Sequence, residues 1–361
     1  MEIRENNIIF LLGAGCSKHA GVPISPDMVK EVENLLKNNN KWEKYTNLYS
    51  YLRSSIEYSE GIFGNFGNAF NIEKLLIIMS EIEKRDKNII YPFIGSWNLR
   101  LAEVAGQNFE NISLLKQLIK DELLDWTNPK NIIDKVDYYK GFERLHSEIG
   151  YSPLRVFSLN YDLCFEKAMG DDEVEQGFDP KNNEWQYSNF EEIRKPFCLY
   201  KLHGSINWYT DRHTGRLMLS NHPVTNPELI FGIDTKLKST DPYFFYTSEF
   251  RKWLLHKDCK IIVTIGYSFA DNYINDLISQ SLINDNQRQL LAVMPIDKDE
   301  IENKKNHLSK EQLSFKHNFN EHCRSQVHIH NEYAENFLSK QITTDFFIKN
   351  EYIKSDEGSP F

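Results

Sequence analysis

The chain has 361 residues, a formal net charge of −10, and 40% hydrophobic residues that include 23 Phe and 18 Tyr. This length is enough to bury a full core in one large domain or two joined ones, and the aromatic content excludes a disordered chain. The negative charge argues against a broad basic face for nucleic acid, so we expect nucleic acid only through a partner. No apolar run approaches the roughly 18 residues of a membrane span, and we expect no membrane contact.

The five cysteines are scattered along the chain, and the closest two, Cys164 and Cys198, are 34 residues apart. The absence of any Cys-x-x-Cys pair excludes a zinc ribbon, and we expect no metal. An odd number of scattered cysteines fits a reducing compartment, so we expect a cytoplasmic protein in which most cysteines are small buried residues.

A glycine-rich turn follows the first apolar run. Residues 8–12 are all apolar, which is typical of a strand buried on both faces of a parallel sheet, and Gly13-Ala14-Gly15-Cys16-Ser17 comes directly after them. Glycine at Gly13 and Gly15 lets the backbone turn tightly and approach a ligand, and N–H groups at such a turn suit the phosphates of a nucleotide. This turn therefore predicts a dinucleotide pocket.

The dehydrogenase version of this motif is not satisfied. Lys18 stands where the third glycine of Gly-x-Gly-x-x-Gly would be. Residues 25–36 predict a helix where a dehydrogenase has its second strand, with Ser25 as the N-cap and Pro26 at the first helical position. The apolar face of this helix is Val29, Val32, Leu35 and Leu36. Hydride transfer is therefore the poorer interpretation.

From about 42 to 150, apolar residues recur at three- and four-residue spacing, which predicts helices. The glycine-rich aromatic stretch 61–70 interrupts this pattern; we interpret it as a loop docked on the core, with a mobile lid or subunit contact as the alternative. The periodic apolar residues are Leu75, Leu76 and Met79, and then Leu114, Leu115, Leu118 and Leu123.

Four further apolar runs predict buried strands, at 154–159, 197–202, 260–265 and 290–294. Together with helices between them, they predict an α/β fold with a doubly wound, mostly parallel, Rossmann-like sheet and a helical insertion. The expected division is a nucleotide-binding catalytic core at 1–41 and 151–300, a helical insertion at 42–150, and a C-terminal extension at 301–361 that completes the domain and ends in a frayed tail.

Polar residues follow three of these strands, at the edge where open α/β sheets bind ligands. Asn160-Tyr161-Asp162 follows the first run, and a histidine-glycine cluster at 203–208 follows the second. The third run is followed by the cluster at 266–271 and then by Asn275. With the first glycine turn, four strand ends could surround one nucleotide.

Taken together, these motifs resemble the sirtuin-like family. The turn at 13–17 with Ala20-Gly21-Val22-Pro23 is similar to its phosphate loop, and Ser158-Leu159-Asn160-Tyr161-Asp162 to its Thr-Gln-Asn-x-Asp signature. Leu202-His203-Gly204 matches its catalytic histidine motif, and Gly266-Tyr267-Ser268 stands for its Gly-Thr-Ser. The resemblance covers roughly residues 7–300 and implies NAD⁺ as the substrate, but it leaves 42–150 unaccounted for.

Departures from the family pattern favour one branch. The four-cysteine zinc module of deacetylase sirtuins is missing, and Ile24-Ser25-Pro26 replaces their Phe-Arg pair, so an acetyl-lysine tunnel is not expected. The chain is more similar to bacterial sirtuin-like NAD hydrolases of antiphage defence. Residues 241–246 and 266–269 resemble members encoded beside a HerA-type hexameric ATPase. Members with a fused nucleotide sensor or an Argonaute-like partner are close alternatives.

The resemblance also implies residue roles. Asn160 and Asp162 would face the nicotinamide ribose, and His203 would be the general base toward a ribose hydroxyl or water. The structural alternatives are an ordinary turn residue for Asn160 and a core histidine for His203. Asp297 would reach the adenosine ribose, with a solvated acid as an equal alternative. For Gly266 and Ser268, which would contact phosphate or ribose, the alternative is a plain strand-end turn. The residues expected to bind the rest of the dinucleotide are Gly13, Ala14, Gly15, Ser17, Pro23, Gly266 and Ser268.

A second cluster near the end of the chain contains His317, His322, Cys323, His328 and His330. His328 and His330 would share one face of a strand, as metal ligands can, but without a fixed fourth ligand we interpret the cluster as incidental.

The leading hypothesis is an NAD⁺ hydrolase that releases nicotinamide and ADP-ribose and depletes NAD⁺ in antiphage defence. The alternatives are a non-catalytic module that binds NAD⁺ or ADP-ribose, and an NAD-dependent protein deacylase. A toxic hydrolase must be held inactive until it is triggered, so we expect a homo-oligomer and a HerA-type hexameric ATPase as partner. The sequence does not predict the trigger or the stoichiometry.

Overall fold

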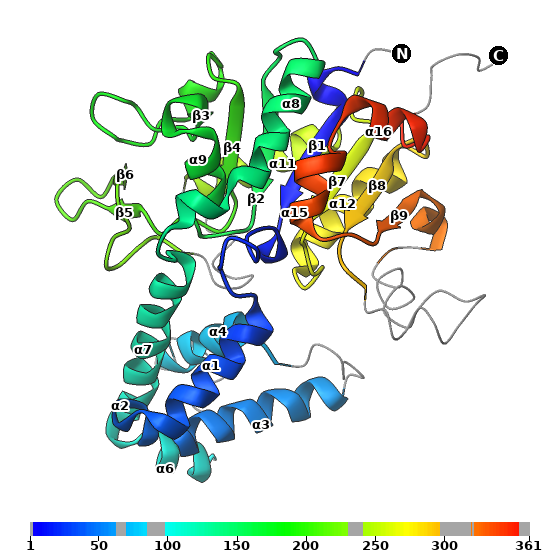
Figure 1. Cartoon of the computed structure of the whole chain (residues 1–361). Helices are drawn as coiled ribbons and strands as arrows, with labels where there is room; N and C mark the ends of the chain where they lie inside the picture. Colours follow the sequence, from blue (N-terminus) through cyan, green and yellow to red (C-terminus); the bar gives the residue numbers. More distant parts are fainter. Residues whose placement is uncertain are drawn as a thin grey trace. The chain divides into compact units, whose positions relative to one another are not determined.

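The computed structural model describes residues 3–62, 70–84, 98–229, 241–296, 319 and 321–353. The chain forms two compact units (Figure 1). The first comprises Met1–Val22, Asn128–Leu229 and Leu237–Phe361, and the second comprises Pro23–Thr127 and Ile230–Lys236. These limits differ from the expected division at 41 and 150, because the helix at 25–38 packs with the other helices of the second unit, and residues 128–150 pack on the sheet.

The first unit is built on a seven-stranded sheet in the order β3-β4-β2-β1-β7-β8-β9. Every neighbouring pair is parallel, which confirms the predicted doubly wound parallel sheet. A separate antiparallel hairpin consists of β5 and β6. The strands are β1 Ile8–Leu12, β2 Leu154–Ser158, β3 Val174–Glu175, β4 Phe197–Lys201, β5 Trp208–Thr210, β6 Leu217–Leu219, β7 Ile261–Ile265, β8 Gln289–Val293 and β9 Val327–His330.

The predicted strands agree with the observed ones to within one residue at each end. Strands β1, β2, β4, β7 and β8 are buried at all five positions. Such continuous burial arises because helices cover both faces of the sheet. On one face Phe10 packs edge-on against Phe142 at 5.0 Å between ring centroids, and on the other Phe157 stacks on Tyr200 at 4.6 Å.

Two hydrophobic clusters show which helices cover which face of the sheet. Residues of α8, α9, α15 and α16 belong to one cluster, and residues of α11 and α12 to the other. These helices are α8 Gly141–Glu148, α9 Cys164–Met169, α11 Tyr243–Leu254, α12 Asn272–Asn284, α15 Ala334–Asn336 and α16 Thr344–Lys349. Strand β1 lies between β2 and β7. The strands β2, β3 and β4 lie on one side of it, and β7, β8 and β9 lie on the other. The carboxyl ends of β1, β2 and β7 therefore form a topological switch point.

The second unit is helical among its described residues. Its helices are α1 Ser25–Asn38, α2 Asn40–Glu43, α3 Thr46–Ile62, α4 Ile72–Glu83, α6 Leu99–Ala105 and α7 Glu110–Thr127. In α4 the predicted apolar residues Leu75, Leu76 and Met79 are buried. In α7 the buried stripe is instead Ile112, Leu115, Ile119 and Leu123, whereas Leu114 is 46% exposed.

Two details of the second unit differ from the sequence-based expectations or extend them. Ser25 is the first residue of α1 rather than its N-cap, which is Ile24, and the Ser25 hydroxyl accepts from the Ile72 N–H at 3.3 Å. Most of the aromatic stretch 61–70 lies outside the described residues. At its end, Phe70 packs edge-on against Tyr49 at 5.8 Å, as expected of a docked aromatic side chain.

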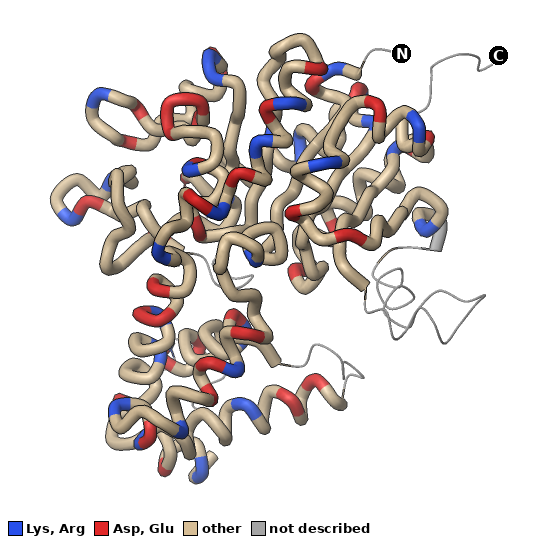
Figure 2. The backbone as a smooth tube through the Cα atoms, in the orientation of Figure 1, with Lys and Arg blue, Asp and Glu red and all other residues tan. Residues whose placement is uncertain are grey.

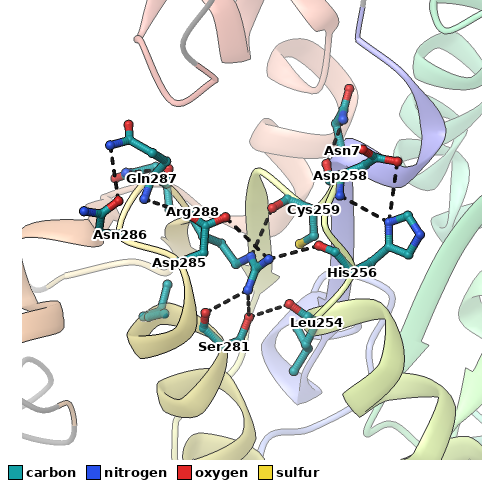
Figure 3. Close-up of polar contacts among 12 residues, drawn as sticks. Asn7, Leu254, His256, Asp258, Cys259, Ser281, Asp285, Asn286, Gln287 and Arg288 are labelled. Atoms are coloured by element: carbon teal, nitrogen blue, oxygen red, sulfur yellow. Dashed lines mark hydrogen bonds and ion pairs between the residues drawn. The ribbon is translucent and has the colours of Figure 1, made fainter. Parts of the chain in front are cut away.

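A buried arginine fixes the edge of the sheet where β7 and β8 begin (Figure 3). Arg288 donates to the carbonyl oxygens of Cys259 at 3.0 Å and Ser281 at 2.8 Å. It also donates to the His256 carbonyl at 3.0 Å, and the Ser281 hydroxyl donates to the Leu254 carbonyl at 2.6 Å. Because these acceptors lie in α12 and in the segment between α11 and β7, the guanidinium joins these elements and has a structural role.

Lys and Arg residues are interspersed with Asp and Glu along both units, as Figure 2 shows. Among the described residues, none of the helices combines the length and the apolar character needed to cross a membrane. All five cysteines are buried and free.

Candidate functional site

The carboxyl ends of β1, β2, β4 and β7 and the residues that follow them are joined by a closed series of contacts, which we call the strand-end ring. It comprises residues 13–17, 158–162, 201–205 and 266–271. Each segment bonds to the next through at least one hydrogen bond or ion pair, and most of the side chains involved are buried. The ring lies at the topological switch point, where open α/β sheets bind ligands.

The segments after β1 and β7 are in backbone contact. The Gly13 N–H donates to the Ile265 carbonyl, and the Gly15 N–H to the Gly266 carbonyl, both at 2.9 Å. A Cβ atom at Gly13 would lie 2.6 Å from Tyr267 Cα, and one at Gly15 would lie 2.9 Å from Gly266 Cα. The sequence predicted that these glycines allow a ligand to approach; in the structure they allow another stretch of backbone to approach.

Most N–H groups of the first turn already have partners. Besides Gly13 and Gly15, Cys16 donates to the Gly13 carbonyl at 2.9 Å, and Ser17 to the Ala14 carbonyl at 3.2 Å. Phosphate binding at this turn stays a prediction, and these four N–H groups would have to exchange partners to take part in it. The Ala14 residue is exposed.

Gly266 is the most constrained residue of this contact. Its φ is +63°, and a Cβ there would lie 2.2 Å from the Cys16 nitrogen. Gly215 has a similar φ of +69°, but a Cβ there would meet nothing within 4 Å. Gly215→Ala is therefore expected to cost only the conformational penalty of about 1–2 kcal/mol. Gly266→Ala should lower the free energy of unfolding by more than that in urea denaturation; equal losses would contradict the backbone contact.

Asn160 joins the segments after β1 and β2. Its side-chain amide donates to the Gly13 carbonyl at 3.0 Å and to the Ser17 hydroxyl at 3.2 Å, and that hydroxyl lies 3.1 Å from the Tyr139 hydroxyl. Since both Nδ2 hydrogens are used inside the protein, a ligand would meet Asn160 through its Oδ1, which can only accept. The Asn160 side chain thus holds the first turn in place, in addition to any contact that it makes with a ligand.

Asp162 is buried where the chain turns into α9. Its Oδ1 accepts from the Cys164 N–H at 2.9 Å, and this bond fixes the turn. Burial raises the pKa of the neighbouring Cys16 thiol to about 12 and that of Cys164 well above its usual value. Both thiols are therefore protonated at neutral pH and are poor nucleophiles.

Lys201, the last residue of β4, joins the segments after β2 and β4. Its buried ammonium donates to the Asp162 carbonyl at 2.5 Å, to Glu166 Oε1 at 2.9 Å and to the Ser205 hydroxyl at 2.8 Å. Burial raises the pKa of Glu166, and the positive charge of Lys201 opposes that rise. No motif in the sequence indicates this ion pair.

His203 and Asp271 join the segments after β4 and β7. The imidazole Nε2 lies 3.2 Å from Asp271 Oδ2, and both side chains are buried. The other carboxylate oxygen, Oδ1, accepts from the N–H groups of Tyr273 at 3.1 Å and Ile274 at 3.4 Å, and so caps α12. In the sequence, Asp271 is part of the cluster at 266–271 and was assigned no role of its own. Its position directly before a helix could have indicated that it is the N-cap.

The remaining predicted residues are not all brought together. Ser268 is exposed on the segment after β7, and Pro23 belongs to the second unit. Asp297 lies outside the described residues, so its contact with the adenosine ribose stays a prediction.

The histidines of β9 are partly buried and bonded to glutamines. His328 Nε2 lies 2.7 Å from Gln289 Oε1, and His330 Nε2 lies 2.6 Å from Gln341 Oε1. His317 and the side chain of His322 lie outside the described residues. No group of His, Cys, Asp and Glu side chains suited to a metal occurs in the part of the chain that the structure describes.

Comparison with known proteins identifies one part of the chain. Residues 154–316 match a family described as SIR2-like domain, and this range contains the ring segments after β2, β4 and β7. The match supports a sirtuin-like fold and an NAD-related function of sirtuin type. No curated protein matches the chain in sequence. The structure of Sir2Tm bound to a propionylated peptide is similar at 11% identity and a TM-score of 0.37, over 96% of this chain and 94% of that chain.

Proposed function

We propose that this chain hydrolyses NAD⁺ at the bond between nicotinamide and ribose and releases nicotinamide and ADP-ribose. The observation that carries the proposal is the strand-end ring, because it joins the segments that carry His203, Asn160 and Asp162 at the switch point of a parallel sheet. The SIR2-like match over 154–316 supports NAD⁺ as the ligand.

For this reaction the protein mainly needs to orient the dinucleotide and the attacking water and to accept one proton. Nicotinamide is a good leaving group, and its departure develops an oxocarbenium-like charge on the ribose. His203 acts as the general base toward a ribose hydroxyl or the attacking water. Asn160 accepts a hydrogen bond from the same ribose or water through Oδ1, and the Asp162 carboxylate faces the developing positive charge.

The dinucleotide is held by the segments after β1 and β7. In this proposal it contacts the exposed residues Ala14 and Ser268, which flank the backbone contact between the two segments. The further residues of this binding set are Gly13, Gly15, Ser17, Pro23, Gly266 and Asp297.

The proposed biological role uses the same chemistry. Transfer of the ADP-ribosyl group to water depletes NAD⁺, and we propose that the chain belongs to the NAD-depleting effectors of antiphage defence in the cytoplasm. Such an activity must be restrained, which a homo-oligomer and a HerA-type hexameric ATPase partner would provide.

Release of nicotinamide from NAD⁺ by the purified chain tests the proposal. The assay is run with the chain alone, with the ATPase and with an acyl-lysine peptide, and the mass of each sample is measured in parallel. We expect peptide-independent release of nicotinamide and ADP-ribose in at least one of the first two samples, from a homo-oligomer. Release only with peptide would identify a deacylase, whereas NAD⁺ binding without release in any sample would identify a regulatory module.

A further inference from the structure

The Asp271 carboxylate has two different partners. Oδ1 accepts from the backbone of α12, and Oδ2 lies 3.2 Å from His203 Nε2. The residue that contacts the imidazole is thus the N-cap of α12. Because α12 is 13 residues long and anchored in the core through Ile274 and Ile278, the carboxylate is held on a rigid element.

The loop before Asp271 is fixed as well. The Tyr267 hydroxyl donates to the Asp271 carbonyl at 3.1 Å and lies 2.9 Å from Asn275 Oδ1. The Asn275 amide donates to the Phe269 carbonyl at 2.8 Å. These bonds tie the strand end to the first turn of α12, so the position of the carboxylate relative to β7 is set before any ligand binds.

An ionised carboxylate can only accept hydrogen bonds. Nε2 must therefore carry the proton in the His203–Asp271 contact, and in a neutral imidazole the other nitrogen, Nδ1, is then the acceptor. The ring of Tyr161 lies 6.3 Å from the His203 imidazole between centroids.

We infer that Asp271 is a positioning residue that selects the Nε2–H tautomer of His203 and leaves Nδ1 as the nitrogen that accepts a proton from substrate or water. The tautomer itself follows from the contact geometry, and its catalytic consequence rests on the proposed function. Asp271, the N-cap of α12, thereby joins the predicted set His203, Asn160 and Asp162, and its Oδ2 orients the imidazole.

Asp271→Asn separates this role from the helix cap. The N–H groups of Tyr273 and Ile274 need an acceptor, so the amide oxygen of the new side chain stays at the Oδ1 position and its NH₂ faces His203. Nε2 must then accept, and the proton moves to Nδ1, which can no longer act as a base. Replacing the carboxylate beside a catalytic imidazole by an amide has this effect in serine proteases.

The first measurement does not involve NAD⁺. Protein labelled with ¹⁵N at histidine is examined by NMR in mildly alkaline solution, and the His203 signals are assigned by their loss in His203→Ala. We expect a protonated Nε2 in the wild type and a protonated Nδ1 in Asp271→Asn. The same tautomer in both proteins, or a protonated Nδ1 in the wild type, would overturn the inference.

The second measurement is steady-state hydrolysis of NAD⁺. Asp271→Asn is expected to lower kcat roughly 10²–10⁴-fold with KM changed less than about threefold, because base catalysis is lost but binding is not. Asp285→Asn, at the other end of α12, serves as the matched control and should keep the wild-type kcat. If the tautomer switches as expected but the wild type releases no nicotinamide, the positioning role stands and the proposed function fails.

Discussion

Replacing His203 by alanine is expected to lower the turnover of NAD⁺ roughly 10²–10⁴-fold, the usual contribution of a general base. The reason is that no other imidazole belongs to the strand-end ring, among the residues that the structure describes. Binding of NAD⁺ should persist, since in our proposal the phosphates contact the segments after β1 and β7. Turnover is measured by nicotinamide release, and binding by calorimetry.

His146→Ala is the matched control for the loss of a buried imidazole. His146 lies on α8, and its ring packs 5.5 Å from that of Phe197, the first residue of β4 and thus at the edge of the sheet opposite the ring. This variant should turn over NAD⁺ at the wild-type rate. The Asp271 carboxylate keeps its bonds to α12 in His203→Ala, so that variant should fold. Wild-type turnover by folded His203→Ala would refute the proposed role of His203.

The sheet was largely predictable because its strands are short and buried on both faces. Five consecutive apolar residues at 8–12 leave few alternatives to a buried strand, and at 261–265 only Thr264 interrupts the apolar run. Strand β3 has only two residues, which is too short for any periodicity to appear in the sequence.

The limits of the compact units were not predictable from local patterns. The sequence of α8 is amphipathic, but only the contact of Phe142 with Phe10 shows that this helix covers the sheet. Similarly, α1 follows the first turn directly, yet its Ser25 bonds to Ile72 of α4. Such contacts join residues far apart in the chain, and no spacing rule encodes them.

In the candidate site, the motifs identified the residues but not what they contact. Gly-x-Gly spacing indicates that something approaches the backbone at Gly13 and Gly15, and only the structure shows that it is the segment at 266–267. The side-chain amide of Asn160 donates to the Gly13 carbonyl and the Ser17 hydroxyl, and the sequence could not predict these two partners either.

The Lys201–Glu166 pair joins residues 35 positions apart in sequence. We expect this pair to contribute to the free energy of unfolding. Both side chains are almost fully buried, with 1% and 3% of their surface exposed. Lys201→Met removes the partner of a buried carboxylate and should cost about 3–5 kcal/mol of stability. Lys167→Met is the matched control, because Lys167 pairs with the exposed Asp171 at 3.0 Å and should cost at most about 1 kcal/mol.

The penalty for losing Lys201 should also depend on pH. Burial raises the pKa of Glu166, and Lys201 opposes this rise, so in Lys201→Met the folded-state pKa is raised further. Between the unfolded and folded pKa values, the native state holds a proton that the unfolded state has lost. Stability therefore falls as pH rises through this window. Below the window Glu166 is protonated in both states, and the penalty of the variant relative to wild type shrinks.

Urea unfolding at about pH 5 and pH 7.5 measures this dependence. We expect the difference in unfolding free energy between wild type and Lys201→Met to be larger at the higher pH, and that of Lys167→Met to stay constant. Adding Glu166→Gln to Lys201→Met should recover part of the lost stability at pH 7.5, because a neutral amide leaves no unpaired charge in the core. The bonds from Lys201 to the Asp162 carbonyl and Ser205 hydroxyl are not restored, so recovery should be incomplete. A penalty that is independent of pH and unaffected by Glu166→Gln would show that Lys201 stabilises the ring only through its bonds to the Tyr161 and Asp162 carbonyls and to the Ser205 hydroxyl.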